Sequence, residues 1–351
     1  MPRLVLDDRE RIELAGIRRF FASRVIGQDE AIQVVVDRIA MLKAGLTDPA
    51  RPIAVFLFAG PTGTGKTELA KTLAEFLFGS AERLIRLDMS EFQAVESTRK
   101  ILGEPNATAE GQALTDRVRK QPFSVVLLDE FEKAHPNAWD LFLQVFDDGR
   151  LTDATGQTVD FRHCIIVLTS NLGSTIKENA GPGFVPTGGS FSQEHVMRAV
   201  QQNFRPEFVN RLDAIIVFRP LTRELMRGIL GKELAGVLER RGLRHREWAV
   251  EWESSALDFL LDKGFSPTMG ARPLKRAIDR YLLVPDLAPG KQMALVAALN
   301  STAASSTVVR RYRLDSSPLI RDGVHHWRTG RQDLVLEGDF DLLADVLGAT
   351  T

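Results

Sequence analysis

The segment GPTGTGKT, Gly60–Thr67, holds three glycines, a lysine and a threonine at a spacing that suits a phosphate chain. It comes directly after an apolar run that predicts a strand and directly before a helical pattern. Glycine lets the backbone pass close to an anion, and the amide groups at a helix N-terminus point toward it. The lysine is placed to reach β- and γ-phosphates, and the last threonine to offer its hydroxyl to Mg²⁺. We therefore predict nucleotide binding by Gly60, Pro61, Thr62, Gly63, Thr64, Gly65, Lys66 and Thr67.

Two adjacent carboxylates follow another apolar run, in the segment VVLLDEFEKAH. Asp129, at the end of the predicted strand, is suited to holding Mg²⁺ through water. Glu130 is suited to accepting a proton from an attacking water molecule. A pair of solvated carboxylates at a strand end is the alternative, which the nearby glycine loop makes the weaker interpretation. The two segments together predict an ATPase that uses ATP and Mg²⁺, with Thr67 and Asp129 as metal-binding residues.

Five short aliphatic runs must position these residues. They are IAVFLFAG (53–60), RLIRLD (83–88), SVVLLDE (124–130), CIIVLTSN (164–171) and AIIVF (214–218). Several are apolar almost throughout, as expected for parallel strands covered on both faces. Helical patterns lie between the runs, and the one at 136–150 has Pro136 at a first helical position and Gly149 at its end. These features predict an α/β fold in which a five-stranded parallel sheet lies between helices.

The chain after Pro220 has a different pattern. Three helical segments predict a small helical domain with no strand among them: 221–242, 254–264 and 270–282. From about residue 285 the sequence is rich in Ala, Ser and Thr, with possible strands only at STVVRRYRL and DLVLEG. We therefore expect a lead-in helix in 1–24, a large α/β domain in 25–220, a small helical lid domain in 221–284 and a divergent, partly disordered tail in 285–351.

Composition and charge limit the class of protein. Of the 351 residues 44% are hydrophobic and 26% are charged, as in ordinary globular domains, and the formal net charge is -1. Such a balance gives no general attraction to nucleic acid or to a membrane surface. We find no signal peptide and no apolar run near the roughly 20 residues needed to cross a bilayer. The single cysteine, Cys164, lies in an apolar run and predicts a buried thiol in a reducing compartment, so we expect a cytoplasmic protein.

Four longer segments extend the pattern: DEFEKAHPNAWDLFLQVFDDGRLTD, VDFRHCIIVLTSNLGS, NFRPEFVNRLDAIIVFRPL and GARPLKRAI. They resemble the second ATPase module of the Clp unfoldases and disaggregases (ClpA, ClpB and ClpC), members of the AAA+ class. The similarity extends from about Val25 to about Val284. It implies a P-loop AAA+ ATPase domain followed by a helical lid, in a chaperone that remodels proteins. In RVIGQDEA, Val25 and Ile26 resemble the apolar wall of the family's adenine pocket.

The resemblance implies roles for further polar residues. Asn171 in TSN takes the sensor-1 position, next to the γ-phosphate and the attacking water, and Arg272 in GAR takes the sensor-2 position. Arg211 in NRLD resembles the arginine finger, which reaches into the site of a neighbouring subunit. Arg205 is interpreted instead as part of a surface ion pair. A finger that acts in trans implies a ring of identical subunits, by analogy a hexamer.

Two segments depart from the family pattern. Between the second and third predicted strands the family carries a pore loop with a gripping aromatic residue, but ILGEPNATAEGQALTD (101–116) has none. Asn106, Ala107 and Thr108 offer little of the contact area of an aromatic ring, so threading of polypeptide is in question. After TSNLGS, the segment GPGFVPTGG favours a surface loop over a tripeptide that docks a ClpP-type protease.

Three functions are therefore open from the sequence. The first is an ATP-driven remodelling chaperone of Clp type, acting on proteins as a ring. The second is an ATP-dependent switch or scaffold that does not thread polypeptide, because the pore-loop aromatic is absent. The third is a nucleic-acid-directed motor, which the balanced charge and the lack of a basic, aromatic-containing stretch disfavour. A one-module protein and a piece of a longer chain are equally compatible with these patterns.

Overall fold

The computed structural model of the protein describes residues 14–103, 113–173, 191–238, 249–252, 254–266, 269–282, 308–313, 319–322 and 328–329. The chain divides into two compact units, Met1–Pro220 and Leu221–Thr351. Three sequence expectations fall outside the described residues. They concern the loop residues Asn106, Ala107 and Thr108, the segment 181–189 and the strand expected at 333–338.

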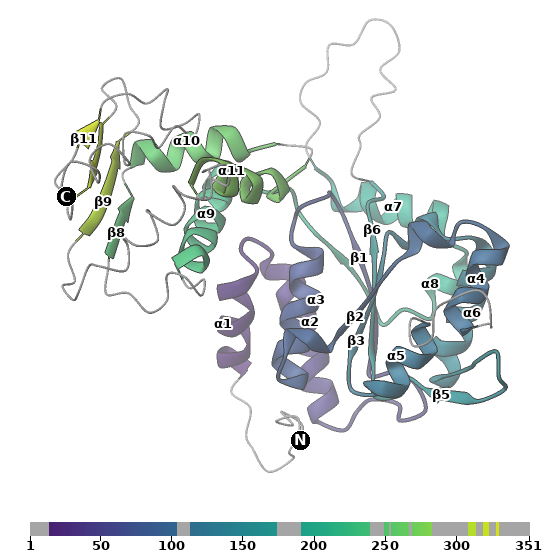
Figure 1. Ribbon diagram of the computed structural model, residues 1–351. Helices are drawn as coiled ribbons and strands as arrows, with labels where there is room; N and C mark the ends of the chain where they lie inside the picture. The colour runs from purple at the N-terminus through teal and green to yellow at the C-terminus, as the bar shows by residue number, and fades with distance from the viewer. Residues whose placement is uncertain are drawn as a thin grey trace, which may run out of the picture. The chain divides into compact units, whose positions relative to one another are not determined.

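The first unit is built on a five-stranded sheet whose strands all run parallel (Figure 1). From edge to edge the order is β2 (Leu84–Asp88), β3 (Val125–Asp129), β6 (Ile165–Ser170), β1 (Ala54–Ala59) and β7 (Ala214–Val217). Every residue of β1, β3 and β6 is buried. The five predicted strands are confirmed, and parallel pairing brings their carboxyl ends to one edge, where ligands of open α/β sheets bind.

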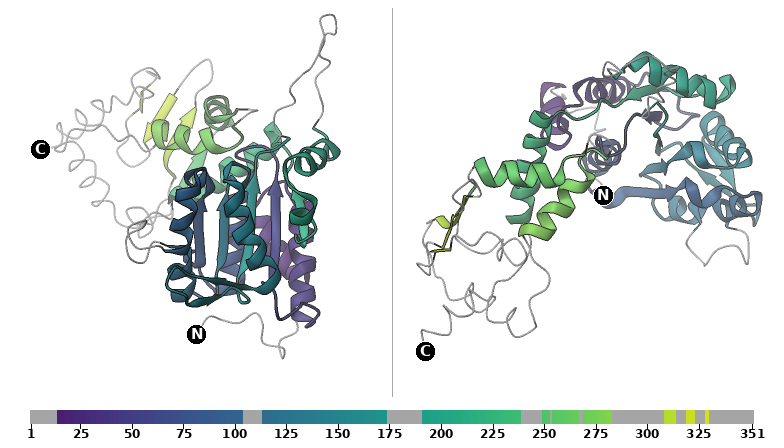
Figure 2. Two further views of the ribbon diagram at one scale, coloured as in Figure 1. Left: turned by 90° about the vertical axis from the view of Figure 1, so that its right-hand side faces the viewer. Right: turned by 90° about the horizontal axis from the view of Figure 1, so that it is seen from above.

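Helices cover both faces of this sheet (Figures 1 and 2). One face carries α1 (Leu14–Arg24), α2 (Asp29–Lys43) and α3 (Lys66–Phe78), which share a core with Phe56 and Phe58 of β1. The other face carries α4 (Val95–Leu102), α5 (Leu114–Lys120), α6 (Pro136–Asp148), α7 (Gln193–Asn203) and α8 (Pro206–Val209). None of the helices described in either unit has the length and apolar character needed to cross a bilayer.

Helix α6 begins and ends where the sequence indicates. Pro136 is its first residue, and His135 before it accepts a hydrogen bond from Asn137 through its side chain. Gly149 ends it with φ of 58°. The glycine is also required sterically, because an added Cβ would lie 2.6 Å from the carbonyl oxygen of Ala50. The helix boundary is therefore fixed by local chemistry.

The described part of the first unit also contains short elements that the sequence did not predict. β4 (Arg150–Thr152) and β5 (Thr158–Asp160) form an antiparallel hairpin. Each buries one side chain, Leu151 or Val159, so neither gives an apolar pattern long enough to indicate a strand. Three short 3₁₀ turns follow α3, β2 and β3, namely η1 (Ala81–Arg83), η2 (Met89–Phe92) and η3 (Phe131–Lys133).

The second unit contains helices and a sheet. α9 (Arg223–Leu238), α10 (Ser254–Gly264) and α11 (Arg272–Leu282) correspond to the three predicted helices and share an apolar core. The expectation of no strand among them is wrong, because β8 (Ala249–Trp252) lies between α9 and α10. It pairs with β9 (Val308–Arg313), within the possible strand STVVRRYRL, and the sheet continues through β10 (Leu319–Asp322) and β11 (Arg328–Thr329). The pairing partner of β8 is distant in sequence, so no local pattern indicated it.

Candidate nucleotide-binding and hydrolysis site

The predicted phosphate loop, residues 60–67, joins β1 to α3 at the carboxyl edge of the sheet. Its three glycines have positive φ: 140° at Gly60, 74° at Gly63 and 108° at Gly65. Gly60 is required for a second reason, because an added Cβ would lie 2.4 Å from the carbonyl oxygen of Phe218. The loop conformation therefore depends on the absence of side chains, which leaves room beside its backbone amides.

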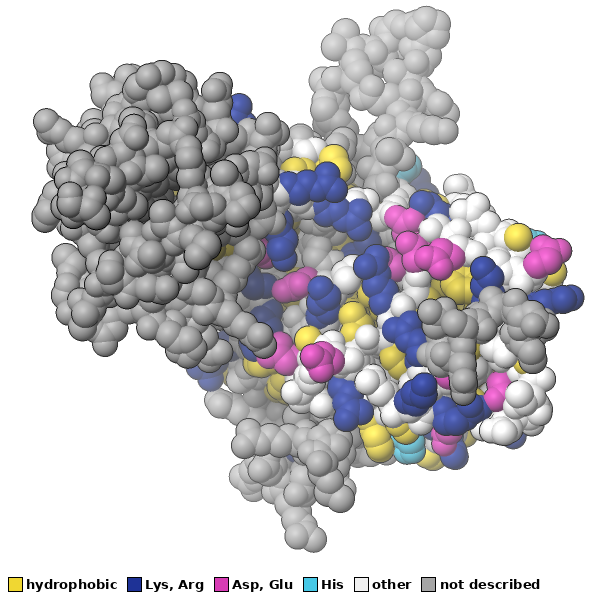
Figure 3. Space-filling model, in the orientation of Figure 1, with side chains coloured by type: hydrophobic (Ala, Val, Ile, Leu, Met, Phe, Trp, Pro, Cys, Tyr) yellow, Lys and Arg dark blue, Asp and Glu magenta, His cyan; other side chains and the backbone are white. Residues whose placement is uncertain are grey.

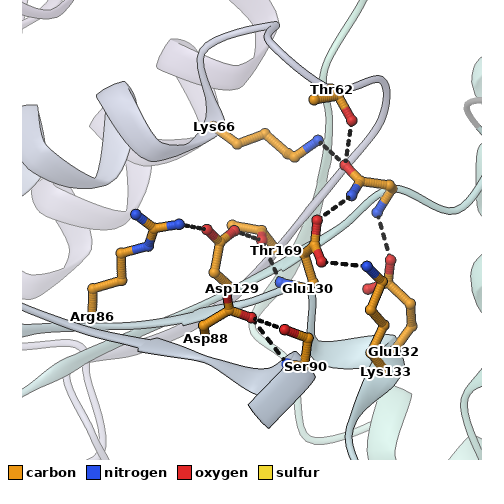
Figure 4. Close-up of polar contacts among 11 residues, drawn as sticks. Thr62, Lys66, Arg86, Asp88, Ser90, Asp129, Glu130, Glu132, Lys133 and Thr169 are labelled. Carbon is orange, nitrogen blue, oxygen red and sulfur yellow. Dashed lines mark hydrogen bonds and ion pairs between the residues drawn. The ribbon is translucent and has the colours of Figure 1, made fainter. Parts of the chain in front are cut away.

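The side chain of Lys66 folds back into this loop (Figure 4). Its ammonium group donates to the carbonyl oxygens of Gly60 at 2.6 Å and Pro61 at 2.9 Å, and to Oδ1 of Asn171 at 3.0 Å. The Thr62 hydroxyl donates to the same Asn171 oxygen at 3.3 Å. Because Lys66 is only 8% exposed, the loop holds a largely buried cation. Such a cation is placed to meet an anion that enters the loop.

Asp129, the last residue of β3, has both carboxylate oxygens engaged. Oδ2 accepts from Nη2 of Arg86 in β2 at 2.6 Å, and Oδ1 accepts from the Thr169 hydroxyl in β6 at 2.5 Å. The Asp129 side chain is 10% exposed, whereas the Arg86 side chain is 51% exposed. A carboxylate held in this way suits contact with Mg²⁺ through water, because Mg²⁺ keeps several of its waters.

Glu130 lies beside Asn171, the residue that contacts Lys66. Oε1 of Glu130 accepts from Nδ2 of Asn171 at 3.3 Å, and Oε2 pairs with the Lys133 ammonium at 2.5 Å (Figure 4). The hydrogen bond to Glu130 is the main cause that raises the pKa of Lys133. Polar contacts therefore connect Lys66 through Asn171 to Glu130, across the ends of three elements.

Two further carboxylates, Glu132 and Asp88, lie close to the residues of this site. Oε1 of Glu132 accepts from the backbone N of Asn171 at 3.0 Å, which fixes the residue after β6. At the end of β2, Asp88 lies opposite Asp129 in the strand register. The Ser90 hydroxyl donates to Asp88 at 2.6 Å and is the main cause that lowers the pKa of that carboxyl.

Gln28 forms hydrogen bonds both to the glycine loop and to the segment that follows β7. It is 3% exposed, and its Nε2 donates to the carbonyl oxygens of Thr64 at 3.2 Å and Arg219 at 2.9 Å. Val25 is buried, with Cγ1 placed 3.5 Å from where a Cβ on Gly65 would lie, and Ile26 is half-buried. The segment that carries Val25 and Ile26 is thus held against the predicted nucleotide loop.

The residues at this edge fit a Mg²⁺-bound nucleotide. The loop has a curved backbone without Cβ atoms, and the buried Lys66 cation provides positive charge within it. Thr67, the second residue of α3, is half-buried and offers a hydroxyl. With the Asp129 carboxylate it supplies the hard oxygen ligands that Mg²⁺ prefers.

Arg211 lies at the amino ends of the parallel strands, opposite the carboxyl ends where the glycine loop lies. Asp213, two residues later, donates from its backbone N to the carbonyl oxygen of Val55 near the start of β1 at 2.8 Å. The Arg211 side chain donates to Asp147 at 2.5 Å and to the Glu207 carbonyl oxygen at 2.7 Å. The length of β1, about 15 Å or more, therefore separates Arg211 from the glycine loop of its own chain.

The sequence singled out two further arginines. Arg272 is the exposed first residue of α11, in the second unit. Arg205 forms ion pairs with Asp140 at 3.4 Å and Glu207 at 3.6 Å, so its interpretation as a surface pair is confirmed. On the face that Figure 3 shows, basic and acidic side chains are interspersed over the described residues.

Sequence reasoning missed five residues whose side chains contact the predicted site residues at the carboxyl edge of the sheet: Gln28, Arg86, Glu132, Lys133 and Thr169. Thr169 gave a signal, since it is a polar residue inside the apolar run CIIVLTSN. Glu132 and Lys133 also gave a signal, since they follow Glu130 by two and three residues in the segment DEFEKAH. Arg86 and Gln28 gave none, because only the fold brings Arg86 beside Asp129 and Gln28 beside Thr64.

Two family models match this chain. Residues 51–215 match the AAA domain (Cdc48 subfamily), and residues 221–288 match the C-terminal, D2-small domain of ClpB protein. The two matches cover the predicted site residues except Val25 and Ile26, and they cover the three helices of the second unit.

Curated relatives agree with these matches. The chain is 48% identical over 290 residues to the chaperone protein ClpB of Meiothermus ruber, covering 81% of this chain and 33% of the relative. It is 48% identical over 282 residues to ClpB of Vibrio cholerae, covering 79% and 32%. The chain thus spans about a third of the length of these relatives.

Solved structures are similar as well. The S. cerevisiae Hsp104–ADP complex has a TM-score of 0.71 and 36% identity, covering 86% of this chain and 51% of that one. A closed state of Hsp104 with ATPγS and FITC casein has a TM-score of 0.71 and 34% identity, covering 90% and 54%.

Proposed function

The chain belongs to the Clp family of AAA+ ATPases, and on this premise we propose that it is an ATP-hydrolysing subunit of a ring that remodels proteins. The observation that carries the proposal is the continuous contact from Lys66 through Asn171 to Glu130. It joins a phosphate-binding loop to a proton acceptor beside a Mg²⁺-binding carboxylate, which is the arrangement that hydrolysis of a triphosphate requires.

Each residue has a distinct task in this proposal. Lys66 binds the β- and γ-phosphates, and Thr67 and Asp129 hold Mg²⁺, the latter through water. Bound Mg²⁺ neutralises charge on the phosphate oxygens. Glu130 accepts a proton from the attacking water, and Asn171 orients the Glu130 carboxylate and that water. Val25 and Ile26 line the adenine side.

We extend the proposal to assembly and substrate. Arg211 completes the site of a neighbouring subunit, Arg272 senses nucleotide from the small domain, and the ring is a homohexamer. The substrate is polypeptide, in the cytoplasm. One support is that a solved Hsp104 structure holds FITC casein.

The test begins with phosphate release by the purified chain with Mg²⁺ and ATP. We expect steady turnover, and a loss of at least about tenfold in Lys66→Ala, because the buried cation that meets the phosphates is gone. Lys71→Ala is the matched control, since Lys71 is an exposed lysine of the same helix. Turnover in Lys66→Ala equal to that of the control would remove the glycine loop from the mechanism.

A second assay separates remodelling from switching. A tagged reporter protein is incubated with the chain and ATP, and its unfolding is followed by fluorescence. ATP-dependent unfolding supports remodelling. Steady phosphate release without unfolding indicates an ATP-dependent switch or scaffold instead.

A further inference from the structure

Thr169 joins the two carboxylate residues of the site through a single hydroxyl group (Figure 4). The Thr169 side chain is in β6, and the residue is 1% exposed. Its Oγ1 lies 2.5 Å from Oδ1 of Asp129 and 3.0 Å from the backbone N of Glu130. Thr169 has no task in the proposed function described above, which uses the glycine loop, Asp129, Glu130 and Asn171.

The chemistry of the three groups fixes the direction of both hydrogen bonds. A backbone N–H only donates, so the Thr169 oxygen accepts from Glu130. A carboxylate only accepts, so the Thr169 hydrogen is donated to Asp129. One hydroxyl therefore satisfies both neighbours at once, and it holds the Asp129 carboxylate in one orientation.

The strand register explains why Thr169 reaches Asp129. Leu128 of β3 is paired with Leu168 of β6, so the next residues, Asp129 and Thr169, lie side by side and point to the same face. Valine has the same shape at this position but no hydroxyl. Serine has the hydroxyl but lacks the methyl group.

Glu130 has an unusual backbone conformation, which makes the second hydrogen bond important. Its φ is 57°, and among the described residues it is the one non-glycine residue with positive φ. Such a conformation is unfavourable for a residue with a Cβ and persists when neighbouring groups hold it. It ends β3 and allows the Glu130 side chain to reach Asn171. The Thr169 hydroxyl binds the backbone at this turn.

We infer that Thr169 is a positioning residue, which orients the Asp129 carboxylate for Mg²⁺ and holds the turn that aims Glu130 at the attacking water. The inference rests on the proposed ATPase function. The other oxygen of Asp129 is paired with the half-exposed Arg86, so Thr169 provides the buried one of its two contacts.

The test compares Thr169→Val with Thr169→Ser. We expect Thr169→Val to lower kcat by about tenfold to a hundredfold, the usual cost of losing a group that orients a metal ligand. Binding of a fluorescent ADP analogue without Mg²⁺ should be unchanged. The gain in affinity on adding Mg²⁺ should shrink, which reports on the site independently of turnover. Thr169→Ser should restore both properties to within about threefold of the unsubstituted chain.

Thr72→Val is the matched control. Thr72 is a buried threonine in α3 whose hydroxyl donates to the Glu68 carbonyl oxygen at 2.8 Å, outside the site. Thr72→Val should keep kcat and the gain in ADP affinity on adding Mg²⁺, and its Tm should change by about as much as that of Thr169→Val. If Thr169→Val keeps both properties, or if Thr169→Ser loses as much as Thr169→Val, the positioning role is wrong. Absence of turnover in the unsubstituted chain would contradict the proposed ATPase function, while the Mg²⁺ effect on ADP binding would still test Thr169.

Discussion

Each charged side chain at the site lies close to a group that compensates its charge. Asp129 is paired with Arg86 at 2.6 Å and Glu130 with Lys133 at 2.5 Å. The Lys66 ammonium lies inside the glycine loop, where it contacts the Gly60 carbonyl oxygen at 2.6 Å. Each carboxylate thus has a cation beside it, and the positive charge of the loop lies where the proposal places the phosphates.

Replacement of Glu130 by glutamine tests the proton acceptor. The amide keeps the size of the side chain but cannot take a proton from water. We expect ATP binding close to normal and hydrolysis slowed by about a hundredfold or more, the usual scale for loss of a general base. The measurements are binding of a fluorescent ATP analogue and steady-state phosphate release.

The control for this substitution is Glu82→Gln, which makes the same change at an exposed residue of η1. It should hydrolyse ATP at the normal rate. Turnover of Glu130→Gln at the rate of this control would remove Glu130 from the mechanism.

At the scale of elements, the β4–β5 hairpin and the turn within it contact both α4 and α5, the two helices that flank residues 104–112. The backbone N of Ala154 donates to the carbonyl oxygen of Leu102, at the end of α4, at 3.0 Å. Asp153 accepts from Arg119 of α5 at 2.5 Å, and its side chain is 7% exposed. The hairpin therefore fixes the positions at which the chain enters and leaves this segment.

Asp153 makes the stability of the hairpin depend on pH. The Thr155 hydroxyl is the main cause that lowers the pKa of Asp153 to about 2, with help from the backbone amides of Gln157 and Thr155 and from Arg119. A lowered pKa in the folded state stabilises the protein above the unfolded pKa near 4, and this contribution is lost as the pH falls toward 2. We expect Asp153→Asn to cost roughly 1–2 kcal/mol at pH 7 and to lower Tm by about 2–6 °C.

Thermal unfolding between pH 7 and pH 3 checks this. The gap in Tm between the unsubstituted chain and Asp153→Asn should narrow below pH 4. Asp148→Asn, which removes a half-exposed carboxylate paired with Arg150 at 3.5 Å, should change Tm little at any pH. A gap that is constant with pH would show that ionisation of Asp153 does not stabilise the hairpin.

The elements also show what the sequence can predict. β1, β3 and β6 are apolar throughout most of their length and were predicted to within one residue or two. β8 was not, because its pairing with β9 depends on residues far along the chain. The glycine loop is a local motif, and its place between a strand and a helix was predicted, whereas the contact between Arg86 and Asp129 depends on the order of strands in the sheet. Local motifs can be predicted from a sequence, whereas the pairing of strands far apart in the chain is much harder to predict.

At the scale of the whole molecule, the position of Arg211 bears on the proposal that it completes the site of a neighbouring subunit. It lies at the amino edge of the sheet beside Asp147, and Lys66 lies at the carboxyl edge. If Arg211 acts on a γ-phosphate, as proposed, it therefore acts on the site of a neighbouring copy and not on that of its own chain. The contacts with Asp147 and the Glu207 carbonyl oxygen fix the Arg211 side chain at this end of the sheet.

Mixing variants tests whether Arg211 acts in trans. Arg211→Ala should bind nucleotide normally and lose turnover by about a hundredfold or more, because arginine fingers stabilise charge that develops in the transition state. Lys66→Ala has a defective loop but keeps the arginine. In mixed rings, an Arg211→Ala site beside a Lys66→Ala neighbour is complete, so the mixture should release phosphate faster than either variant alone. Arg205→Ala, an exposed arginine paired with Asp140, should hydrolyse ATP normally. If native mass spectrometry shows mixed rings without recovered turnover, or if Arg211→Ala alone is fully active, the neighbour does not supply this residue.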